Sequence, residues 1–404
     1  MFTRYHRILS VPGAVRFSGS ALVARLPIAM DTIGIVLLVT GVGHSYGLAG
    51  ALSAAYLVSA AVLAIPQARL IDRLGQTPVL TTAAVVFAVA MTSFMVVVQS
   101  GGPVWAAYLC VMVAGAAFPQ VGSCVRARWS HVLEERADVD TAYALESAID
   151  EIVFMSGPIL VTVLATAWHP IAGLGSAIVT GTTGTLFFAA QRSTAPVPHP
   201  RPRGTRLARI PLRAMAPVCV VGLALGALFG AAEVSTVAFS VSRDREDLAG
   251  LLLALWAAGS MIAGVITGIV HWRVGPATRL RWGALAMAFA MAPLSLIGSM
   301  WVMGAWLFVA GFAIAPTMVA TLSLVEQTVP HSRLTEGMAI VETALVAGVA
   351  PGAALAGRII DSHGASTAYL VSLVSGVVAA LVALTLRDPD VSPERDRVAR
   401  PEGA

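Results

Sequence analysis

Stretches of roughly 20 or more apolar residues, each long enough to cross about 30 Å of hydrocarbon, recur along this chain of 404 residues. They lie at 14–41, 46–67, 78–99, 102–126, 139–167 and 170–190, and then at 212–240, 248–270, 276–298, 300–325, 334–358 and 365–386. Hydrophobic residues make up 57% of the chain and charged residues 12%, which is about half the charge of a soluble domain. We therefore expect an all-α integral membrane protein with twelve transmembrane helices in two bundles of six.

The distribution of arginine predicts the orientation of these helices. If both termini are inside, the inner loops and tails contain 21 of the 26 arginines, and the outer loops contain Arg243, Arg245 and Arg358. Basic residues accumulate on the cytoplasmic side of membrane proteins. We expect a multi-pass protein of the inner (cytoplasmic) cell membrane with both termini in the cytoplasm.

The chain divides into two bundles, a linker and a tail. The expected bundles are 1–190 and 214–386. Between them, 191–213 contains six arginines, five prolines and no acid, so it does not continue a helix. We interpret this linker as a cytoplasmic tether, and contact with anionic lipid is the alternative. The polar tail 387–404 is expected to be disordered.

Several functions are excluded by composition. All 26 basic residues are arginine, so a phosphate-binding loop with its lysine and a Schiff-base lysine are both impossible. No H-E-x-x-H motif or cysteine spacing indicates a metal site, and no nucleophile–base pair indicates an enzyme. We expect no cofactor and no nucleic-acid partner. The arginines are expected to set the orientation of the helices in the membrane.

A short motif follows the second apolar stretch. Residues 68–76 read Ala-Arg-Leu-Ile-Asp-Arg-Leu-Gly-Gln. This segment resembles the G-x-L-a-D-R-x-G-r-k loop signature of the major facilitator superfamily, with alanine in place of the first glycine. The equivalent loop of the second half, 268–275, keeps its glycines and Arg273, with Trp272 where the aspartate would be.

The resemblance covers 14–386 and implies two six-helix repeats with a substrate site between them, open alternately to either side. It also implies an inner gate. Asp72 is expected to accept hydrogen bonds from the start of the eleventh helix, and Arg73 to pair with an acid at the inner end of helix 4 or 5. A charged tight turn without a gating role is the alternative. The expected gate residues are Asp72, Arg73, Gly75, Arg126, Arg128, Glu146 and Arg273.

Ionisable residues inside a membrane are costly unless they are paired, neutral or facing a cavity. Asp150 and Glu151 lie about 17 Å along the fifth helix, near the midplane. We expect one of them to pair with Arg25 of the first helix. The pair is either a static tie between two helices or a protonatable switch that frees the arginine for substrate.

We also interpret four other acids of the expected helices, namely Glu233, Glu342, Glu146 and Asp31. Glu233 stands alone in an apolar run of the seventh helix and is a candidate proton or cation carrier; a satisfied or lipid-shielded acid is the alternative. Glu342 is a second, weaker candidate. Glu146 is expected near the inner surface, neutralised by Arg126 or Arg128, and Asp31 near the outer face, where water would hydrate it.

Gly157 and Pro158 resemble the helix-5 kink of proton-coupled drug exporters, although such kinks are ordinary in membrane helices. We expect a monomeric secondary transporter that exports a small organic solute in exchange for protons and contacts membrane lipid. The alternatives are a proton-linked importer of a sugar, nucleoside or organic acid, and a non-transporting membrane receptor with the same fold.

Overall fold

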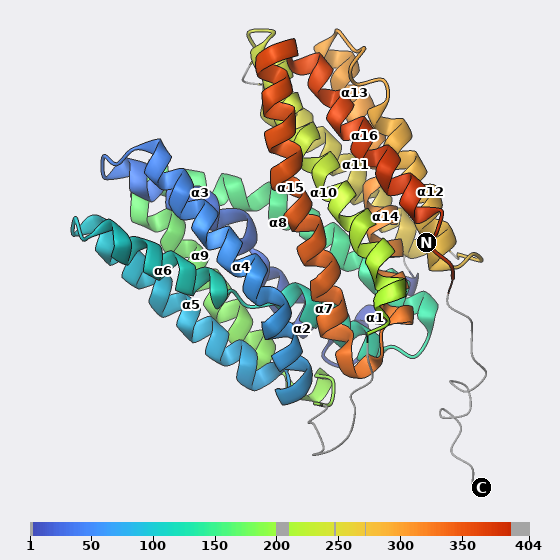
Figure 1. Cartoon of the computed structure of the whole chain (residues 1–404). Coiled ribbons are helices and arrows are strands. Elements are labelled where there is room, and N and C mark those ends of the chain that lie inside the picture. Colours follow the sequence, from blue (N-terminus) through green and yellow to red (C-terminus); the bar gives the residue numbers. More distant parts are fainter. Residues whose placement is uncertain (1–2, 199–209, 246–247, 271, 389–404) are drawn as a thin grey trace, which may run out of the picture.

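The structure is a computed structural model that describes residues 3–198, 210–245, 248–270 and 272–388, and every regular element in these ranges is a helix (Figure 1). The helices before the linker are α1 (Thr3–Leu9), α2 (Ala14–Arg25), α3 (Pro27–Gly41), α4 (Tyr46–Leu74), α5 (Gln76–Gln99), α6 (Val104–Ala116), α7 (Val121–Val132), α8 (Arg136–Ala167) and α9 (Pro170–Ala190). The later ones are α10 (Leu212–Val241), α11 (Ala249–Ile269), α12 (Pro276–Met291), α13 (Met300–Gly311), α14 (Ile314–Thr328), α15 (Leu334–His363) and α16 (Ala365–Ala383). The structure also describes the 3-10 turns η1 (Arg192–Thr194) and η3 (His331–Arg333).

The helices form two bundles, α2–α9 and α10–α16, which meet at one end and diverge at the other (Figure 1). We call the end near the linker the closed end and the opposite end the open end. The expected linker is described at its two ends, where η1 follows α9 and α10 begins at Leu212. The rest of it, 199–209, and the tail from 389 lie outside the described residues.

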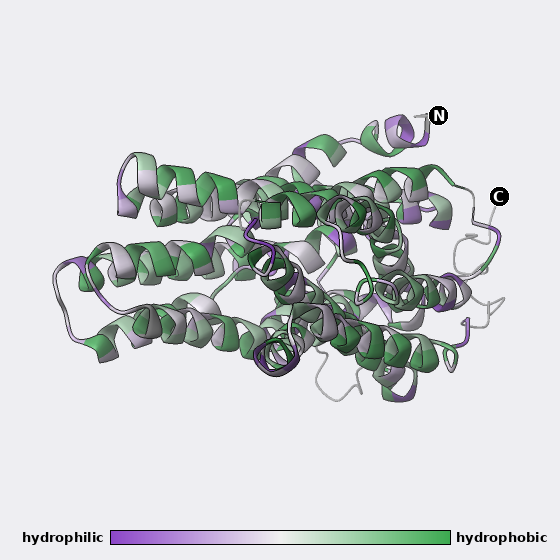
Figure 2. Ribbon diagram, turned by 90° about the horizontal axis from the view of Figure 1, so that it is seen from above, coloured by the Kyte–Doolittle hydropathy of each residue, from purple (hydrophilic) through white to green (hydrophobic). Residues whose placement is uncertain are grey.

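The chain is a multi-span helical protein, as the sequence predicts. Within the described residues, eleven helical segments are long and apolar enough to cross a membrane. The one remaining expected span, 276–298, corresponds to α12. This helix has 16 residues and ends at Met291, although the sequence predicts a helix to residue 298. Pro293 lacks an N–H and disfavours helical geometry in the residue before it, which explains the early end. Hydrophobic colour dominates the helices, and hydrophilic residues gather at their ends (Figure 2).

Three of the expected continuous spans are each built from two helices. The first breaks between α2 and α3 at Leu26, the fourth between α6 and α7, and the tenth between α13 and α14. Each break lies within a few residues of a proline, namely Pro27, Pro119 or Pro316. A proline cannot donate to the carbonyl four residues earlier, so one helical hydrogen bond is missing at each place.

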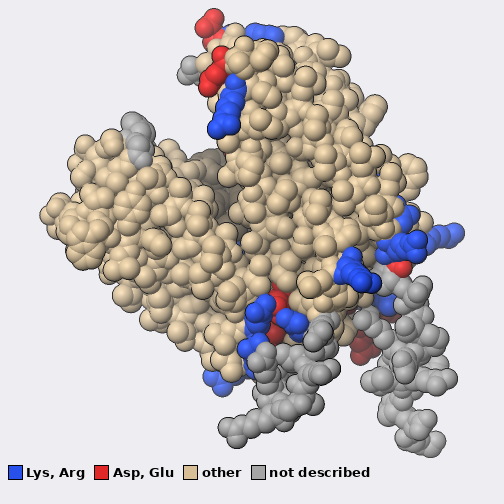
Figure 3. Space-filling view, in the orientation of Figure 1, with Lys and Arg blue, Asp and Glu red and all other residues tan. Residues whose placement is uncertain are grey.

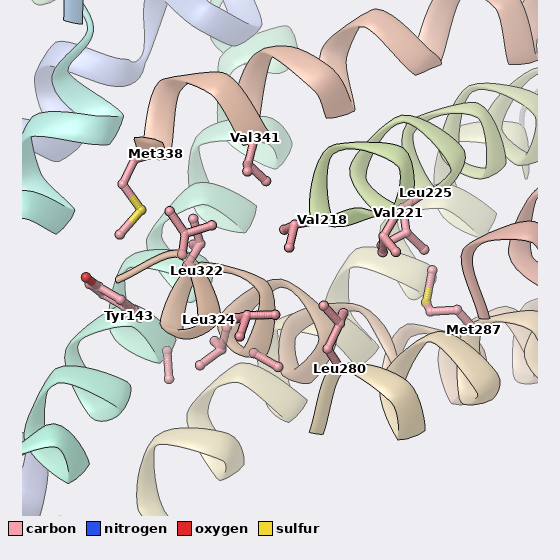
Figure 4. Close-up of a cluster of buried hydrophobic side chains, with 14 of the residues drawn as sticks. Tyr143, Val218, Val221, Leu225, Leu280, Met287, Leu322, Leu324, Met338 and Val341 are labelled. Carbon is pink, nitrogen blue, oxygen red and sulfur yellow. The ribbon is translucent and has the colours of Figure 1, made fainter. Parts of the chain in front are cut away.

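The apolar core shows where the halves join. The largest cluster of buried side chains combines Phe17, Trp129 and Tyr143 of the first half with Val221 and Met338 of the second. Figure 4 shows part of it, with Tyr143 of α8 beside side chains from α10, α12, α14 and α15. A second cluster, which includes Phe87 and Phe94, lies within the first half. Shared burial therefore holds the bundles together at the closed end.

Candidate functional site

The loop between α4 and α5 is fixed at the closed end by Asp72. Its two carboxylate oxygens accept hydrogen bonds from the backbone N–H groups of Thr335 (3.3 Å) and Glu336 (2.9 Å) in the first turn of α15. The first N–H groups of a helix have no partner within it and carry partial positive charge, so a carboxylate satisfies both needs. The contact expected from the motif is therefore present. Gly75 closes the loop with φ +90°, in the left-handed region that favours glycine.

The expected pair of Arg73 with an acid of the fourth or fifth span is absent from the described part of the chain. Instead, Arg69, one turn earlier on α4, contacts Glu336 through Nη2 at 2.7 Å. Glu336 also binds Arg333 at 2.6 Å. The ionic part of this gate therefore lies across the halves, between α4 and the start of α15, and Arg69 was missed because its partner is distant in sequence.

The loop between α11 and α12 closes against α8 by other contacts. Arg273 is exposed and, among the described residues, has no ion-pair partner. Arg279, the first arginine of α12, instead makes two bonds of 2.8 Å and 3.1 Å to the carboxylate of Asp140 on α8. The hydroxyl of Ser323 on α14 also donates to Asp140. We call the contacts of Asp72 with the start of α15 the first lock, and the ion pair of Arg279 with Asp140 the second lock. The second lock was not predicted from the sequence.

Arg25 lies at the centre of a buried charge network in the first half. Its Nη1 donates to Asp150 of α8 at 2.7 Å, which is the pair that the sequence predicts. Its Nη2 also contacts Glu146, whose side chain is fully buried. Ser18 (2.7 Å) and Trp129 (2.8 Å) donate to the other oxygen of Glu146. Glu146 therefore forms its direct ion pair with Arg25, because it lies on the face of α8 that packs on α2, and the direct ion pairs of Arg126 go to other acids.

Arg126 extends the network from the first half into the second. Its Nη2 donates to Asp150 at 2.6 Å and its Nη1 donates to Glu342 of α15 at 3.0 Å. The hydroxyl of Ser123 donates to the same carboxylate of Glu342 at 2.7 Å. A continuous chain of ion pairs thus runs from Arg25 through Asp150 and Arg126 to Glu342, and it crosses the boundary between the bundles.

Arg128 has a different position from the one expected of a gate residue. It is fully buried, and its guanidinium group donates to Gln76 at 2.7 Å and to the backbone carbonyls of Phe188 (3.3 Å) and Gln191 (3.1 Å). It also donates to Thr194 in η1 at 3.2 Å and lies 3.9 Å from the centre of the Phe188 ring. Arg128 therefore fastens the first residues of the linker to the closed end.

The remaining predicted acids lie apart from this network. Glu151 accepts a hydrogen bond of 2.6 Å from the hydroxyl of Ser260 on α11, so it too reaches the second half. Glu233 on α10 is exposed and has no ion-pair or hydrogen-bond partner among the described residues. Neither acid contacts Arg25.

Asp31 is buried rather than hydrated, which corrects the expectation. Its side chain lies inside the first bundle with a residue exposure of 1%, and the hydroxyl of Tyr56 on α4 donates to one of its oxygens. The other oxygen is buried without a partner in the described part of the chain. The pairing depends on how α3 is rotated against α4, which hydrophobic pattern alone does not specify.

The expected kink pair lies in the middle of α8, which runs through Pro158 as one helix. A β-carbon on Gly157 would lie 2.7 Å from that of Ala29 on α3. Glycine therefore lets α8 approach α3 closely at this level. The kink itself stays a prediction.

The space between the bundles opens away from the closed end. Figure 3 shows a hollow between the two lobes, with neutral residues over most of its visible walls. Asp150 and Glu342 keep 27% and 32% of their side-chain surface, whereas Arg25 and Arg126 keep 6% and 8%. A separate cavity of about 410 Å³ lies at the closed end, lined by residues that include Asp72, His131 and His331. Among the described residues, no group of three or more histidine, cysteine or acidic side chains is arranged to hold a metal ion.

Comparison with known proteins identifies the family. The profile described as Major Facilitator Superfamily matches residues 17–305 and, in a second overlapping match, residues 218–403. A search of curated proteins gave no match.

Solved structures with the same fold transport different solutes. The human organic anion transporter MFSD10 (TETRAN) is 15% identical, with a TM-score of 0.68 over 94% of this chain and 99% of its own. A bacterial homologue of the iron transporter ferroportin, solved in an outward-facing state, is 15% identical, with a TM-score of 0.72 over 92% and 98%. The fucose:proton symporter FucP of E. coli is 14% identical, with a TM-score of 0.70 over 95% and 100%. At such identities the likeness establishes the fold.

The family match spans nearly the whole chain, and the apolar helices and the hollow between two bundles agree with it. The chain is a multi-pass membrane transporter, not an enzyme, and it belongs to the Major Facilitator Superfamily.

Proposed function

We propose that this transporter exports a small organic solute across the cytoplasmic membrane in exchange for protons, as a monomer surrounded by lipid. The arginine bias supports an orientation with both termini and the closed end in the cytoplasm. In that orientation the hollow of Figure 3 faces outward. Alternating access then requires the closed-end contacts to break while the open end closes.

The observation that carries this proposal is the chain of ion pairs from Arg25 to Glu342. Asp150 is shared by two arginines, with Nη–O distances of 2.7 Å to Arg25 and 2.6 Å to Arg126. Arg126 in turn binds Glu342 of the other half at 3.0 Å. The network therefore connects a partly exposed carboxylate to the contact that holds the halves together.

Protonation gives this network a switching role. A proton on Asp150 removes its charge and so weakens its attraction for both arginines. A proton on Glu342 weakens the contact between α7 and α15 directly. Breaking a buried ion pair costs about 3–5 kcal/mol when one charge is left uncompensated, which is large enough to change which side of the transporter is open. We infer that proton occupancy of these two carboxylates sets the conformation.

The proposal is tested by flux in proteoliposomes under an imposed pH gradient, with a compound panel chosen by thermal shift on the purified protein. The Asp150→Asn and Glu342→Gln variants are expected to lose at least about 90% of gradient-driven flux while keeping solute binding, because they remove protonatable groups that act in coupling. Glu134→Gln is the matched control, since Glu134 is an exposed acid outside the network.

The outcomes separate the alternatives. Wild-type flux from both Asp150→Asn and Glu342→Gln would refute proton coupling through this network. Solute movement in the same direction as the proton would establish an importer. Binding without flux under any gradient would establish a receptor that has kept the transporter fold.

A further inference from the structure

The start of α2 is joined to the end of α9 by two contacts at the closed end. The side-chain amide of Gln191 donates to the hydroxyl of Ser20 at 3.0 Å. A β-carbon on Gly13 would lie 3.0 Å from the side chain of Thr194 in η1. Residues three or four positions apart share a helix face, so Arg16 lies between these two contacts, on the face of α2 that meets the segment after α9.

Two arginines at this place have no counter-charge. Arg16 lies between the two contacts on α2, and Arg192 lies between them on the segment after α9. Both residues are exposed, and neither has an ion-pair or hydrogen-bond partner among the described residues. No acid is present in α2, α5, α9 or the segment 191–198. Glu146, the acid of α8 that contacts α2 through a serine, is fully buried and already bound by Arg25.

The backbone at the start of α2 adds positive potential. This helix of 12 residues begins after Gly13 without a side-chain cap. The backbone N–H groups of Val15 and Arg16 have no acceptor among the described residues. The free N–H groups and the dipole of a helix start favour an anion, and here they lie beside two guanidinium groups.

The end of α9 does not cancel this potential, because protein donors bind its last carbonyl groups. Arg128 donates to the carbonyls of Phe188 (3.3 Å) and Gln191 (3.1 Å). The hydroxyl of Thr77 on α5 donates to the carbonyl of Ala189 at 2.8 Å. The partial negative charge of this helix end is therefore satisfied within the protein. We call Arg16, Arg192 and the first turn of α2 the arginine junction.

The surface next to the arginine junction is apolar and faces lipid. Helix α9 packs on α2, α3, α5 and α8 of its own half, so its outer face points away from the second half. Phe187, one turn before Gln191, is 70% exposed, and Val15, next to Arg16, is 61% exposed. A basic site at the edge of an exposed apolar surface suits a ligand that combines an anionic head group with acyl chains.

We propose that the arginine junction binds an anionic phospholipid from the leaflet at the closed end. Its phosphate accepts hydrogen bonds from the guanidinium groups of Arg16 and Arg192 and from the start of α2. Its acyl chains lie over Val15 and Phe187. The inference goes beyond the transport function and does not depend on the direction of transport or on proton coupling.

Other phosphate-bearing ligands fit the arginine junction less well. The ammonium group of a zwitterionic phospholipid would find no acid on α2, α5, α9 or 191–198 to compensate for the two arginines. A free phosphate ester would make the ionic contacts but would leave the apolar surface beside them exposed to lipid.

The lipid preference can be measured on the purified full chain by native mass spectrometry. The protein is titrated in one detergent with dioleoyl phosphatidylglycerol, with dioleoyl phosphatidylcholine or with sn-glycerol 1-phosphate. We expect the first phosphatidylglycerol to bind about tenfold or more tightly than the first phosphatidylcholine, since a basic residue near an anionic head group strengthens binding by about fivefold. sn-Glycerol 1-phosphate is expected to bind much more weakly than either lipid.

Variants assign this preference to the junction. Arg16→Gln combined with Arg192→Gln is expected to remove the difference between the two lipids, whereas Arg16→Lys combined with Arg192→Lys keeps part of it because the charges remain. Arg136→Gln is the matched control, since Arg136 is an exposed arginine of the same half that follows Glu135. The unfolding temperature without added lipid should be the same in all of these chains, because the three arginines are exposed.

Three results would overturn the proposal. The first is equal affinity of the wild type for the two lipids. The second is a preference for phosphatidylglycerol that survives the pair of glutamine substitutions, which would place the lipid elsewhere. The third is binding of sn-glycerol 1-phosphate as tight as that of phosphatidylglycerol, which would make the junction a site for a free phosphate ester.

Discussion

In the first half, the loop after α4 presents Asp72 to the start of α15, and its oxygens lie 2.9 Å and 3.3 Å from two backbone nitrogens. In the second half, the equivalent position is Trp272, whose indole N–H donates to the carbonyl of Thr267 in its own half at 3.2 Å. There the partner helix α8 is held by Arg279, which contacts the carboxylate of Asp140. The two loops occupy equivalent places and use opposite charges.

This difference shows what the two equivalent loops have in common. Both loops still place a side chain of one half against the beginning of a long helix of the other. The first lock uses a carboxylate on a helix end, and the second uses a side-chain ion pair with Arg279 stacked 5.5 Å from the centre of the Trp272 ring. A charged cap on a helix end contributes about 1–2 kcal/mol, whereas removing one partner of a buried ion pair costs more. We therefore expect the second lock to be the stronger one.

The largest effect is expected from Arg279→Ala, because it leaves Asp140 without its cation. The side chains of Arg279 and Asp140 are 6% and 21% exposed, and we expect the closed end to be destabilised by about 3 kcal/mol. Spin labels at Ser100 and Gly298, at the open ends of the two halves, would show a shift toward shorter distances as the closed end opens.

The control for this prediction is Arg273→Ala, which removes the same charge from an exposed side chain of the loop that precedes α12. It should leave the distance distribution unchanged. The charge-reversed pair Asp140→Arg with Arg279→Asp should restore part of the lost population. Equal behaviour of Arg279→Ala and Arg273→Ala would show that the second lock has no energetic role.

A smaller effect is expected from Asp72→Ala, which leaves the N–H groups of Thr335 and Glu336 without their acceptor. The loss should be about 1–2 kcal/mol, and Asp72→Asn should lie between this variant and the wild type because the amide keeps one acceptor oxygen. The same spin-label pair measures both. Arg73→Ala is the matched control. If it shifts the distances as much as Asp72→Ala does, the first lock does not depend specifically on Asp72.

The sequence was informative where a single chemical need decides the structure. The twelve apolar stretches predict the spans because lipid leaves few alternatives, and the motif predicts the contact of Asp72 because a helix start needs acceptors. The Arg25–Asp150 pair follows from the cost of uncompensated charge at the midplane. For Asp72 and Arg25, this chemical need specifies what type of partner is required and at which depth in the membrane it lies.

The sequence was less informative where rotation and contact between helices decide the partner. Asp31 pairs with Tyr56 because of the way α3 faces α4, and Arg126 reaches Glu342 because the halves touch at that level. Arg279 and Asp140 belong to different halves, and neither lies in a recognisable motif. The contacts of both locks with the opposite half are long-range, so periodicity along one helix does not reveal them.

Helix α1 adds a neutral contact to the second lock. The hydroxyl of Tyr5 donates to the carbonyl of Val265 on α11 at 3.0 Å, while Arg7 contacts Asp138 at the start of α8. Tyr5→Phe removes one hydrogen bond, and we expect a loss of about 1 kcal/mol in the same spin-label measurement. Tyr108→Phe, on α6 away from the closed end, is the control.

The effect of Tyr5→Phe should not depend on pH in the ordinary range. Burial raises the pKa of Tyr5 from 10.0 to about 12. Because the folded pKa lies above the unfolded one, the contribution of the neutral phenol is complete below about pH 10 and is lost as the pH rises through about 12. A difference between Tyr5→Phe and wild type that changes between about pH 6 and 9 would mean that another group controls this contact.

The smallest effect is expected from Trp272→Ala, which tests whether the ring that replaced the motif aspartate supports Arg279. The Trp272 ring is itself exposed, and a cation–π contact at an exposed site is worth about 0.5–1 kcal/mol, so Trp272→Ala should shift the spin-label distribution slightly and Trp272→Phe less. If the ring works by holding Arg279, Trp272→Ala should have no further effect in a chain that already has Arg279→Ala, because the two changes then remove one interaction. Additive effects would show that the second half gained its lock from the ion pair alone, and that the tryptophan merely fills the place of the lost acid.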